Sequence, residues 1–499
     1  MARTHLPAGM IKTLHERFGL DHLRPGQSEA IDAVLHGRDT LAVMPTGAGK
    51  SLCYQLPALK LAGTTVVVSP LISLMKDQAE KLSGLGLAVA TLNSTLTKKE
   101  EKHALAQISA GESEFIFTTP ERLSHPKFLA TLKQIQINFV VIDEAHCVSQ
   151  WGHDFRPAFL AIGDALAQLG RPPVLALTAT ATEAVARDIE RELKLRDPQI
   201  FRSSILRANL RLEAALLDHA DDKLPRLLAH LQAHVLPGTG CAIIYAASIR
   251  NVESIAEFLR HQRIPARAYH GKLKLAERTE VQNEFMDGSL KIVVATNAFG
   301  LGIDKPDVRS VIHFQFPGTL EAYYQEAGRA GRDGEDAHCL LLFLKRDKSI
   351  QSLFLAGKYP DSAEILAVYA LLAGADADNV TLADLQAAKP VASTKLRVIL
   401  SALKRMKIIR ERRGVGFSLA GGTLSSDRVQ KLVDEYRQKS DGDQEKLQKM
   451  ISYAQSARCR WRILQEYFSE SASSEDCGHC DRCQIEAERR SEADSLMAS

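Results

Sequence analysis

VVIDEAHCVSQWGHDFR, residues 140–156, is the stretch from which we infer the fold. The apolar run from Phe139 to Ile142 predicts a short buried strand. Asp143 and Glu144 follow where such a strand would surface, and parallel α/β sheets carry their chemistry at that edge. Asp143 suits a Mg²⁺ held through water, and Glu144 suits an attacking water that must be oriented or deprotonated. A solvated strand end has the same appearance, so a second site must decide.

That second site is a Gly-rich turn in GRDTLAVMPTGAGKS, residues 37–51. A strand, this turn and a helix beginning near Lys50 predict a phosphate-binding loop. Gly47 and Gly49 let backbone N–H groups face phosphate oxygens, Lys50 supplies a cation, and Ser51 offers a hydroxyl to Mg²⁺. An incidental turn is the alternative, and the carboxylates of residues 143 and 144 disfavour it.

An aromatic loop follows the carboxylates. Trp151, His153, Phe155 and Arg156 lie in a polar, Gly-containing segment about a dozen residues or fewer after the two carboxylates. Aromatic rings stack on bases without regard to sequence, so this loop suits a sensor of nucleic acid beside the hydrolytic centre.

Strand, loop and helix alternate through residues 1–206 and again through residues 207–350. This rhythm predicts two stacked parallel α/β domains with a cleft between them. The strand-bearing stretches are residues 66–78, 118–123 and 175–182 in the first half, and 241–248, 266–271, 291–306 and 311–317 in the second.

Two arginines three residues apart occur in YYQEAGRAGRDG, residues 323–334. Arg332 and its partner Arg329 can reach across the cleft to a γ-phosphate and stabilise charge in the transition state. Gln325 is expected to position phosphate or water, and Asp304 to link nucleotide to nucleic acid. A solvated arginine pair is the plain alternative.

These motifs together resemble the RecQ family of superfamily-two DNA helicases. The resemblance rests on residues 44–51 (MPTGAGKS), 69–78 (SPLISLMKDQ), 143–146 (DEAH) and above all 149–156 (SQWGHDFR), and it runs from about Phe18 to Asp336. It implies two tandem RecA-like domains, ATP and Mg²⁺ as cofactors, 3′–5′ movement on single-stranded DNA, and coupling of DNA binding to ATP hydrolysis through residues 151, 153, 155 and 156. DNA repair or recombination is implied by the family alone.

The predicted site residues fall into two overlapping sets. The expected catalytic residues are Lys50, Asp143, Glu144, Arg329 and Arg332. The expected nucleotide-binding residues are Arg24, Gln27, Thr46, Gly47, Gly49, Lys50, Ser51, Asp143 and Gln325. Gln27 is expected to pair with the N6 and N7 edge of adenine. Leu23 stands where the family usually has an aromatic residue, so stacking on adenine is expected to be weaker or to come from Phe18.

Beyond the motor, three helical segments and a hairpin predict a winged-helix-like unit. The segments are residues 363–373, 382–388 and 393–406, the last with Ser393 as its expected N-cap, and the hairpin covers residues 408–419. Eight basic residues between Lys395 and Arg413 suit duplex phosphates. Winged helices also serve as docks for proteins, so a packing role stays open.

Four clustered cysteines predict a structural Zn²⁺ site. Cys477, Cys480 and Cys483 have three-residue spacing, and Cys459 supplies the fourth thiolate. His479 can in principle substitute, although it lies between ligands and is expected to point away. The RecQ family has such a module, and Arg458, Arg460, Trp461 and Arg462 beside it are candidate DNA contacts.

The order of these last units is unusual, because most family members place the zinc module before the winged helix. This order puts in doubt a strand-splitting role for the hairpin near residues 412–417. The expected domains are residues 1–206 and 207–350 (RecA-like), 351–425 (winged-helix-like), 426–485 (helical, zinc-binding) and 486–499 (a loose tail).

Composition is that of a soluble globular protein. The chain has 499 residues, 45% hydrophobic and 25% charged, with a net charge of +3. No apolar run reaches the length of a membrane span, so a cytoplasmic protein without a membrane partner is expected. The expected partner is DNA, single-stranded or as a tailed or branched duplex. A single-strand-binding protein or repair proteins are candidate partners that the sequence does not identify. The alternatives are an RNA helicase, or a DNA-stimulated ATPase that remodels or anneals DNA.

Overall fold

The computed structural model describes residues 8–149, 154–300, 303–374, 380–388, 390–412, 416–469 and 475–498. The chain forms two compact units. The first unit comprises residues 1–316, 321–343 and 453–499, and the second comprises residues 317–320 and 344–452. No helix in the described part of the chain is both long and apolar enough to span a bilayer.

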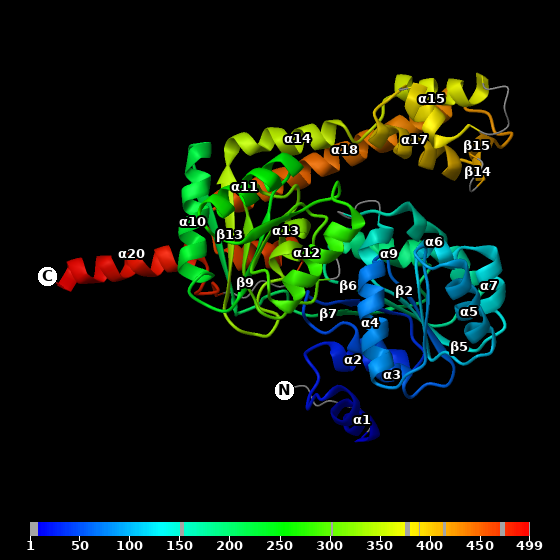
Figure 1. The fold of residues 1–499 in the computed structure, drawn as a ribbon, viewed down its shortest axis with the longest axis horizontal. Coiled ribbons are helices and arrows are strands. Elements are labelled where there is room, and N and C mark those ends of the chain that lie inside the picture. Colours follow the sequence, from blue (N-terminus) through cyan, green and yellow to red (C-terminus); the bar gives the residue numbers. More distant parts are fainter. Residues whose placement is uncertain are drawn as a thin grey trace. The chain divides into compact units, whose positions relative to one another are not determined.

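A seven-stranded sheet forms the N-terminal part of the first unit (Figure 1). All its neighbouring strands run parallel. Their order across the sheet is β3 (Val89–Leu92), β4 (Phe115–Thr118), β2 (Thr64–Val68), β5 (Ile137–Ile142), β6 (Val174–Thr178), β1 (Thr40–Val43) and β7 (Gln199–Arg202). The predicted strand before Asp143 is therefore β5, near the middle of the sheet.

Both faces of this sheet are buried, which is why its strands read as continuous apolar runs. Leu41 and Val43 join one hydrophobic cluster, and Ala42 and Met44 join another. Helices α5 (Lys98–Ser109), α7 (Pro126–Leu132), α8 (Ile162–Gln168) and α9 (Glu183–Leu193) contribute to the first cluster. Helices α2 (Gln27–Leu35), α3 (Leu52–Ala58) and α4 (Ile72–Gly84) contribute to the second. Shorter elements are α1 (Ala8–Phe18), α6 (Pro120–Leu123), η1 (Ala145–Val148) and η2 (Pro157–Ala161).

A six-stranded sheet forms the second α/β domain of the same unit. Its order is β10 (Ala266–Tyr269), β11 (Ile292–Ala295), β9 (Cys241–Tyr245), β12 (Val308–His313), β13 (Ala337–Leu344) and β8 (Leu210–Leu217), and the first five strands are parallel. Its helices are η3 (Ala220–Asp222), α10 (Lys223–His234), α11 (Ile249–His261), α12 (Leu275–Asp287) and α13 (Leu320–Ala327). The prediction of two tandem parallel-sheet domains is confirmed.

The second unit is mostly helical and has its own hydrophobic core. It contains η4 (Lys345–Asp347), α14 (Lys348–Ala356), α15 (Ser362–Gly374), α16 (Leu382–Ala388), α17 (Ser393–Arg405), β14 (Ile409–Arg412), β15 (Gly416–Leu419) and most of α18 (Ser426–Gln455). Val380 pairs with Phe417, which adds a bridge beside the hairpin. The predicted succession of three helices and a hairpin is therefore present.

Two details differ from the sequence predictions. Ala392, not Ser393, is the N-cap of α17, so residue 393 is already helical. The expected loose tail begins inside α20 (Asp481–Ala498), which continues as a helix through residue 498. Helix-forming Ala, Glu and Arg residues explain this extension, because they favour helix wherever no breaker intervenes.

Candidate active site and metal centre

A cavity of about 780 Å³ is lined by both α/β domains of the first unit. All the residues predicted for catalysis and nucleotide binding line it. They are Arg24, Gln27, Thr46, Gly47, Gly49, Lys50, Ser51, Asp143, Glu144, Gln325, Arg329 and Arg332. Phe18 also lines the cavity, whereas Leu23 is not among its lining residues and packs in the apolar cluster of α1, α2 and α3.

The Gly-rich turn after β1 is tightly packed against Gln27. Gly49 has a φ of +75°, and a Cβ built there would lie 2.7 Å from Gln27 Nε2. The Gln27 amide donates to the carbonyls of Ala48 (3.0 Å) and Gly49 (2.9 Å), and its Oε1 accepts from the Arg24 backbone N–H (2.8 Å). In this structure Gln27 thus holds the turn through the groups that the sequence assigns to adenine.

Lys50 lines the cavity. Its ammonium donates to the carbonyls of Met44 (3.2 Å) and Pro45 (3.4 Å). Burial lowers the pKa of Lys50 from its ordinary value, and the charges of Glu144 and Asp143 oppose this shift. The Lys50 ammonium is thus stabilised by both carboxylates, whereas the two carboxylates repel each other.

Asp143 and Glu144 lie just past β5, as predicted. Asp143 accepts from Ser69 Oγ (3.3 Å) and from the Glu144 backbone N–H (3.0 Å). Burial, followed by the nearby charge of Glu144, raises the pKa of Asp143 to about 7. Two close carboxylates with oxygen lone pairs to spare fit a divalent cation such as Mg²⁺.

Glu144 has a left-handed backbone, with φ 50° and ψ 47°. Non-glycine residues adopt this conformation rarely, and such residues cluster at functional sites. Its Oε2 is buried, accepts no hydrogen bond, and lies 3.3 Å from Nδ1 of His146. A ring nitrogen of His146 contacts Thr178 Oγ1 at the end of β6 (3.0 Å). A buried carboxylate oxygen that accepts no hydrogen bond is suited to bind a water or hydroxyl proton.

The two arginines come from the segment after α13. Arg332 Nη1 donates to Asp304 Oδ1 (2.7 Å), and Lys81 of α4 donates to Asp304 Oδ2 (3.1 Å). Arg329 is 6% exposed and donates to the Gly300 carbonyl. The Nε atoms of both arginines are buried without hydrogen-bond partners. Buried guanidinium groups with unused donors suit an anionic ligand.

Two residues that the sequence analysis missed also hold the surroundings of Arg332, and one of them, Lys81, joins the two α/β domains. Lys81 reaches Asp304, and Arg207 donates to the carbonyls of Gly328 (2.9 Å) and Gly331. Neither belongs to a motif, and only the folded chain brings them to these partners.

The predicted DNA-coupling loop is described only in part. Trp151 and His153 lie outside the described residues. Phe155 is half-buried. Arg156 pairs with Asp154 (2.9 Å) and donates to the Pro70 carbonyl (3.1 Å), which ties the loop to the end of β2.

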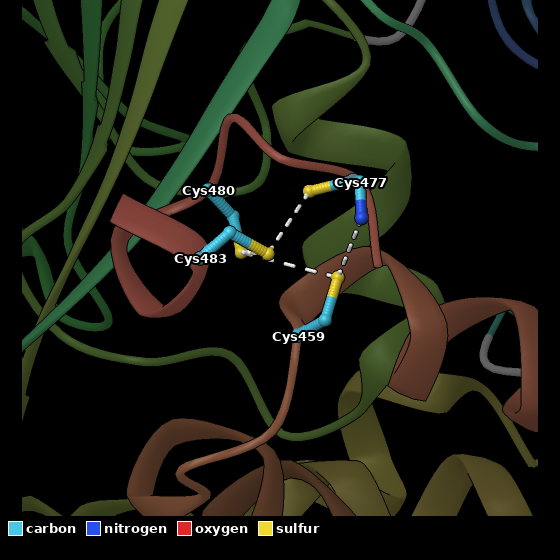
Figure 2. Close-up of side chains that lie close together, drawn as sticks. All are labelled: Cys459, Cys477, Cys480 and Cys483. Atoms are coloured by element: carbon cyan, nitrogen blue, oxygen red, sulfur yellow. Dashed lines mark hydrogen bonds between the residues drawn. The ribbon is translucent and has the colours of Figure 1, made fainter. Parts of the chain in front are cut away.

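The four cysteines converge, and Figure 2 shows their side chains turned toward one another. Their Sγ atoms lie 3.4 Å (Cys480 to Cys483), 3.8 Å (Cys477 to Cys483) and 4.0 Å (Cys480 to Cys459) apart. Four thiolates at Zn–S distances of about 2.3 Å would stand about 3.8 Å apart at the corners of a tetrahedron. The cysteine geometry therefore fits Zn²⁺.

Backbone N–H groups also face this cluster. Arg460 N donates to Cys480 Sγ (3.4 Å), and Cys477 N donates to Cys459 Sγ (3.4 Å). Such contacts stabilise thiolates and orient metal ligands. His479 contacts the Cys477 carbonyl with Nδ1 (2.7 Å) and is not among the clustered ligand atoms.

The expectation that Arg460 and Trp461 contact DNA is wrong. These residues begin α19 (Arg460–Tyr467) and are 0% and 1% exposed. Arg460 makes two 2.9 Å contacts with Asp481, and Trp461 Nε1 donates to the Leu210 carbonyl (3.2 Å). Trp461 thus docks α19 onto β8 of the second sheet domain, and Arg460 ties α19 to the segment that carries Asp481. Arg458 and Arg462 remain accessible, at 55% and 37% side-chain exposure.

The basic residues of the second unit are partly neutralised. Lys395 pairs with Glu364 (2.8 Å), Arg405 pairs with Glu435 (2.8 Å), and Lys404 pairs with Glu411. Arg413 lies outside the described residues. The sequence count of positive charge therefore overstates the charge left for phosphates.

Three family models match the chain. The DEAD/DEAH box helicase model matches residues 24–189, the helicase conserved C-terminal domain model matches residues 222–334, and the RecQ zinc-binding model matches residues 426–484. Together they cover both sheet domains and the four cysteines.

Relatives match over part or nearly all of the chain. An ATP-dependent DNA helicase RecQ from Synechocystis is 34% identical over 95% of this chain and 98% of its own length. A RecQ helicase from Pasteurella multocida is 42% identical over 68% of this chain, a match that spans 52% of that relative.

Among solved structures, the helicase Lhr of Mycobacterium smegmatis, bound to single-stranded DNA and AMP-PNP, has a TM-score of 0.55. It is 21% identical, and the match covers 83% of this chain and 60% of that one. This likeness concerns the fold alone.

Proposed function

This chain belongs to the RecQ family of ATP-dependent DNA helicases, and we propose that it hydrolyses ATP to move 3′–5′ along single-stranded DNA and to separate duplexes. One observation carries the proposal. Lys50, Asp143 and Glu144 of the first sheet domain share a cavity with Arg329 and Arg332 of the second. A motor needs such a site, because nucleotide bound between two domains ties their approach to hydrolysis.

In the proposed mechanism Lys50 binds the β and γ phosphates, and the turn at residues 47–51 holds them with backbone N–H groups. Asp143 and Ser51 would hold Mg²⁺, which supplies positive charge to the phosphates. Glu144, with its unpartnered buried oxygen, orients the attacking water and receives its proton. Arg332 stabilises charge on the transferred phosphoryl group, and Arg329 holds the segment beside it.

Adenine recognition is proposed for the Phe18 side of the cavity. Phe18 and Arg24 line it, and Gln27 is already hydrogen-bonded to the Gly-rich turn. Pairing of Gln27 with adenine would require its amide to leave the Ala48 and Gly49 carbonyls. We propose that Gln27 instead holds the Gly-rich turn in place beside the adenine site, so that the position of the turn and the binding of the base are linked.

The aromatic loop is the proposed coupling element. Trp151, His153 and Phe155 supply rings for bases. Arg156 already ties this loop to the Pro70 carbonyl, at the strand end next to Ser69, which in turn donates to Asp143. A change in the position of the loop on DNA binding would therefore shift Pro70 and Ser69, and with them the hydrogen bond to Asp143.

Cys459, Cys477, Cys480 and Cys483 are proposed to bind one structural Zn²⁺. Four thiolates leave no open position for water, so the ion stabilises the fold and takes no part in hydrolysis. Metal analysis should find about one zinc per chain, and none in Cys480→Ser protein. Zinc-free wild-type protein would overturn this assignment.

We propose a cytoplasmic site of action in DNA repair or recombination, since the relatives named above are bacterial DNA helicases. The RNA helicase and the annealing or remodelling ATPase are the rival functions. The DEAH tetrad occurs in RNA helicases too, so the nucleic acid must be tested directly.

The deciding experiment compares ATP hydrolysis with no nucleic acid, single-stranded DNA, duplex DNA and RNA, alongside unwinding of duplexes with a 3′ or a 5′ tail. Stimulation by single-stranded DNA and opening of the 3′-tailed duplex alone are expected. Glu144→Gln protein is the matched control, because it retains the shape of the site and lacks the base. Stimulation by RNA, or stimulation without unwinding, would favour one of the two rivals.

A further inference from the structure

Asp304 lies between two cations that come from different sheet domains. Its Oδ1 accepts from Arg332 Nη1 (2.7 Å), and its Oδ2 accepts from Lys81 Nζ (3.1 Å). Lys81 is on α4 of the first sheet domain, while residues 304 and 332 precede β12 and β13 of the second sheet. One carboxylate thus joins the domains and holds the arginine that faces the cavity.

We propose that Lys81 is a positioning residue for ATP hydrolysis, acting on Arg332 through Asp304. This inference rests on the proposed ATPase function. Lys81 touches neither the cavity nor the carboxylates at residues 143 and 144, because it is not among the cavity's lining residues, whereas Asp304 and Arg332 are.

Arg332 lies close to where the phosphates bind. A Cβ built on Gly47 of the phosphate-binding turn would stand 3.6 Å from Arg332 Cγ. The Arg332 side chain is 14% exposed, and its Nε has no hydrogen-bond partner. The Arg332 side chain thus lies beside the phosphate-binding turn while Asp304 holds its guanidinium.

Asp304 therefore competes with phosphate for Arg332. Partial desolvation raises the pKa of the Asp304 carboxyl, but Arg332 and Lys81 together hold that pKa below its usual range, so the carboxyl stays charged. Lys81 neutralises part of that charge and occupies Oδ2. Without Lys81, both oxygens are open to the guanidinium fork, and bidentate pairing holds an arginine more strongly than a single contact.

The expected consequence appears in turnover. Arg332 acts on the transition state. If Asp304 holds the Arg332 guanidinium more tightly, fewer enzyme molecules have this group on the phosphate, and kcat falls more than KM changes. Lys81 and Asp304 are 60% and 46% exposed, which limits the effect to about two- to fivefold. Asp77, one turn earlier on α4, also feels the charges of Lys81 and Asp304.

The experiment measures kcat and KM for ATP at saturating single-stranded DNA in full-length wild-type, Lys81→Met, Lys81→Arg and Lys76→Met proteins. Lys76 is the matched control, because it lies on the same helix and pairs only with Glu80 at 3.7 Å among the described contacts. We expect Lys81→Met to lose kcat about two- to fivefold with KM nearly unchanged. Lys81→Arg should restore kcat, and Lys76→Met should match wild type.

An Asp304→Asn background tests the route. If Lys81 acts through Asp304, Lys81→Met produces no further loss there, and an equal further loss would overturn the proposal. Unchanged kcat in Lys81→Met, or the same loss in Lys76→Met, would also overturn it. Wild-type protein without ATPase activity would instead refute the proposed function, so the two failures are distinguishable.

Discussion

At the scale of single residues, the candidate active site is a balance of buried charges. Lys50 loses solvation and gains the carboxylates of Asp143 and Glu144, and burial pushes the pKa of Lys50 down while these charges pull it up. Removal of one member leaves the others buried without compensation, which costs more than loss of a surface pair. The site is thus sensitive to single substitutions.

Lys50→Ala should reduce ATP turnover by at least about a hundredfold, because the phosphates lose the cation that neutralises their developing charge. DNA binding measured without nucleotide should stay within about twofold of wild type, because Lys50 is not among the residues proposed to bind bases. Lys60→Ala, an exposed lysine just past α3, is the control and should retain full turnover. Retained turnover in Lys50→Ala protein would contradict the phosphate-binding role.

At the scale of elements, the close packing of the Gly-rich turn against α2 decides which substitutions the turn tolerates. The turn after β1 packs on Gln27 of α2, and a Cβ at residue 49 would meet the Gln27 amide at 2.7 Å. The positive φ of Gly49 adds backbone strain for any other residue. The turn, rather than the strand before it, is the inflexible part of the motif.

Gly49→Ala is therefore expected to raise KM for ATP at least about tenfold, because the turn must shift to admit the methyl group. Gly84→Ala is the matched control, since Gly84 ends α4 and a Cβ there would meet nothing within 4 Å. Its ATP kinetics should be unchanged. Equal KM values in the two variants would argue against the tight packing of the turn.

Three histidines pack where α10 meets β13. The ring of His234 stacks on that of His338 with centroids 3.8 Å apart, and His230 lies 4.8 Å from His234 and contacts Ser310 Oγ (2.7 Å). Burial and the neighbouring histidines lower the pKa of His230 to about 3 and that of His338 to about 4. Arg211, Arg226, Glu213 and Asp336 supply the surrounding charges.

Acid should therefore destabilise this domain. A folded-state pKa below the unfolded value of 6.5 means that the unfolded chain binds more protons between about pH 6.5 and 4. The contribution of the neutral histidines to the free energy of unfolding is therefore complete above about pH 6.5, and it falls as the pH is lowered through that window. Urea unfolding at pH 8, 6 and 5 measures this slope.

In His338→Gln protein the slope should be shallower, because one titrating group is gone. His261→Gln, at the exposed end of α11, should retain the wild-type slope. A steeper or equal slope in His338→Gln would contradict the contribution of the histidine cluster.

At the scale of the whole molecule, residues far apart in the chain complete the second sheet domain. Asp481 directly follows Cys480 in the sequence. Its carboxylate pairs with Arg460 and accepts from the Ala214 backbone N–H of β8 (3.2 Å). The Arg460 guanidinium also faces the Tyr453 ring at 5.4 Å, and Tyr453 Oη lies 3.4 Å from Tyr323 Oη on α13. The cysteine-bearing segments are thus packed against the helix that leads to Arg329 and Arg332.

Arg460→Met should destabilise this region by about 3 kcal/mol, because it leaves the Asp481 carboxylate 11% exposed and without its main partner. We expect a lower Tm and faster release of bound zinc to a chelator. Arg458→Met, two residues away and 55% exposed, should change neither. Equal zinc release in both variants would show that the buried pair does not hold the module in place.

The sequence alone determined the two parallel-sheet domains and the family, because strand periodicity and the glycine, carboxylate and arginine motifs are local signals. Every residue of the expected nucleotide set lines the cavity. The spacing of the four cysteines predicted their convergence for the same reason.

Only the tertiary structure decided which polar groups are used, because their partners lie 21 to 223 residues away along the chain. In the sequence Lys81 is an ordinary helix-surface lysine, and only the fold pairs it with Asp304. Arg460 looks like a DNA contact in the sequence, and only the fold shows it buried and paired with Asp481. Gln27 reads as a base-binding amide until the turn at Gly49 folds against it. Local pattern shows what a side chain can do, and packing decides which partner it meets.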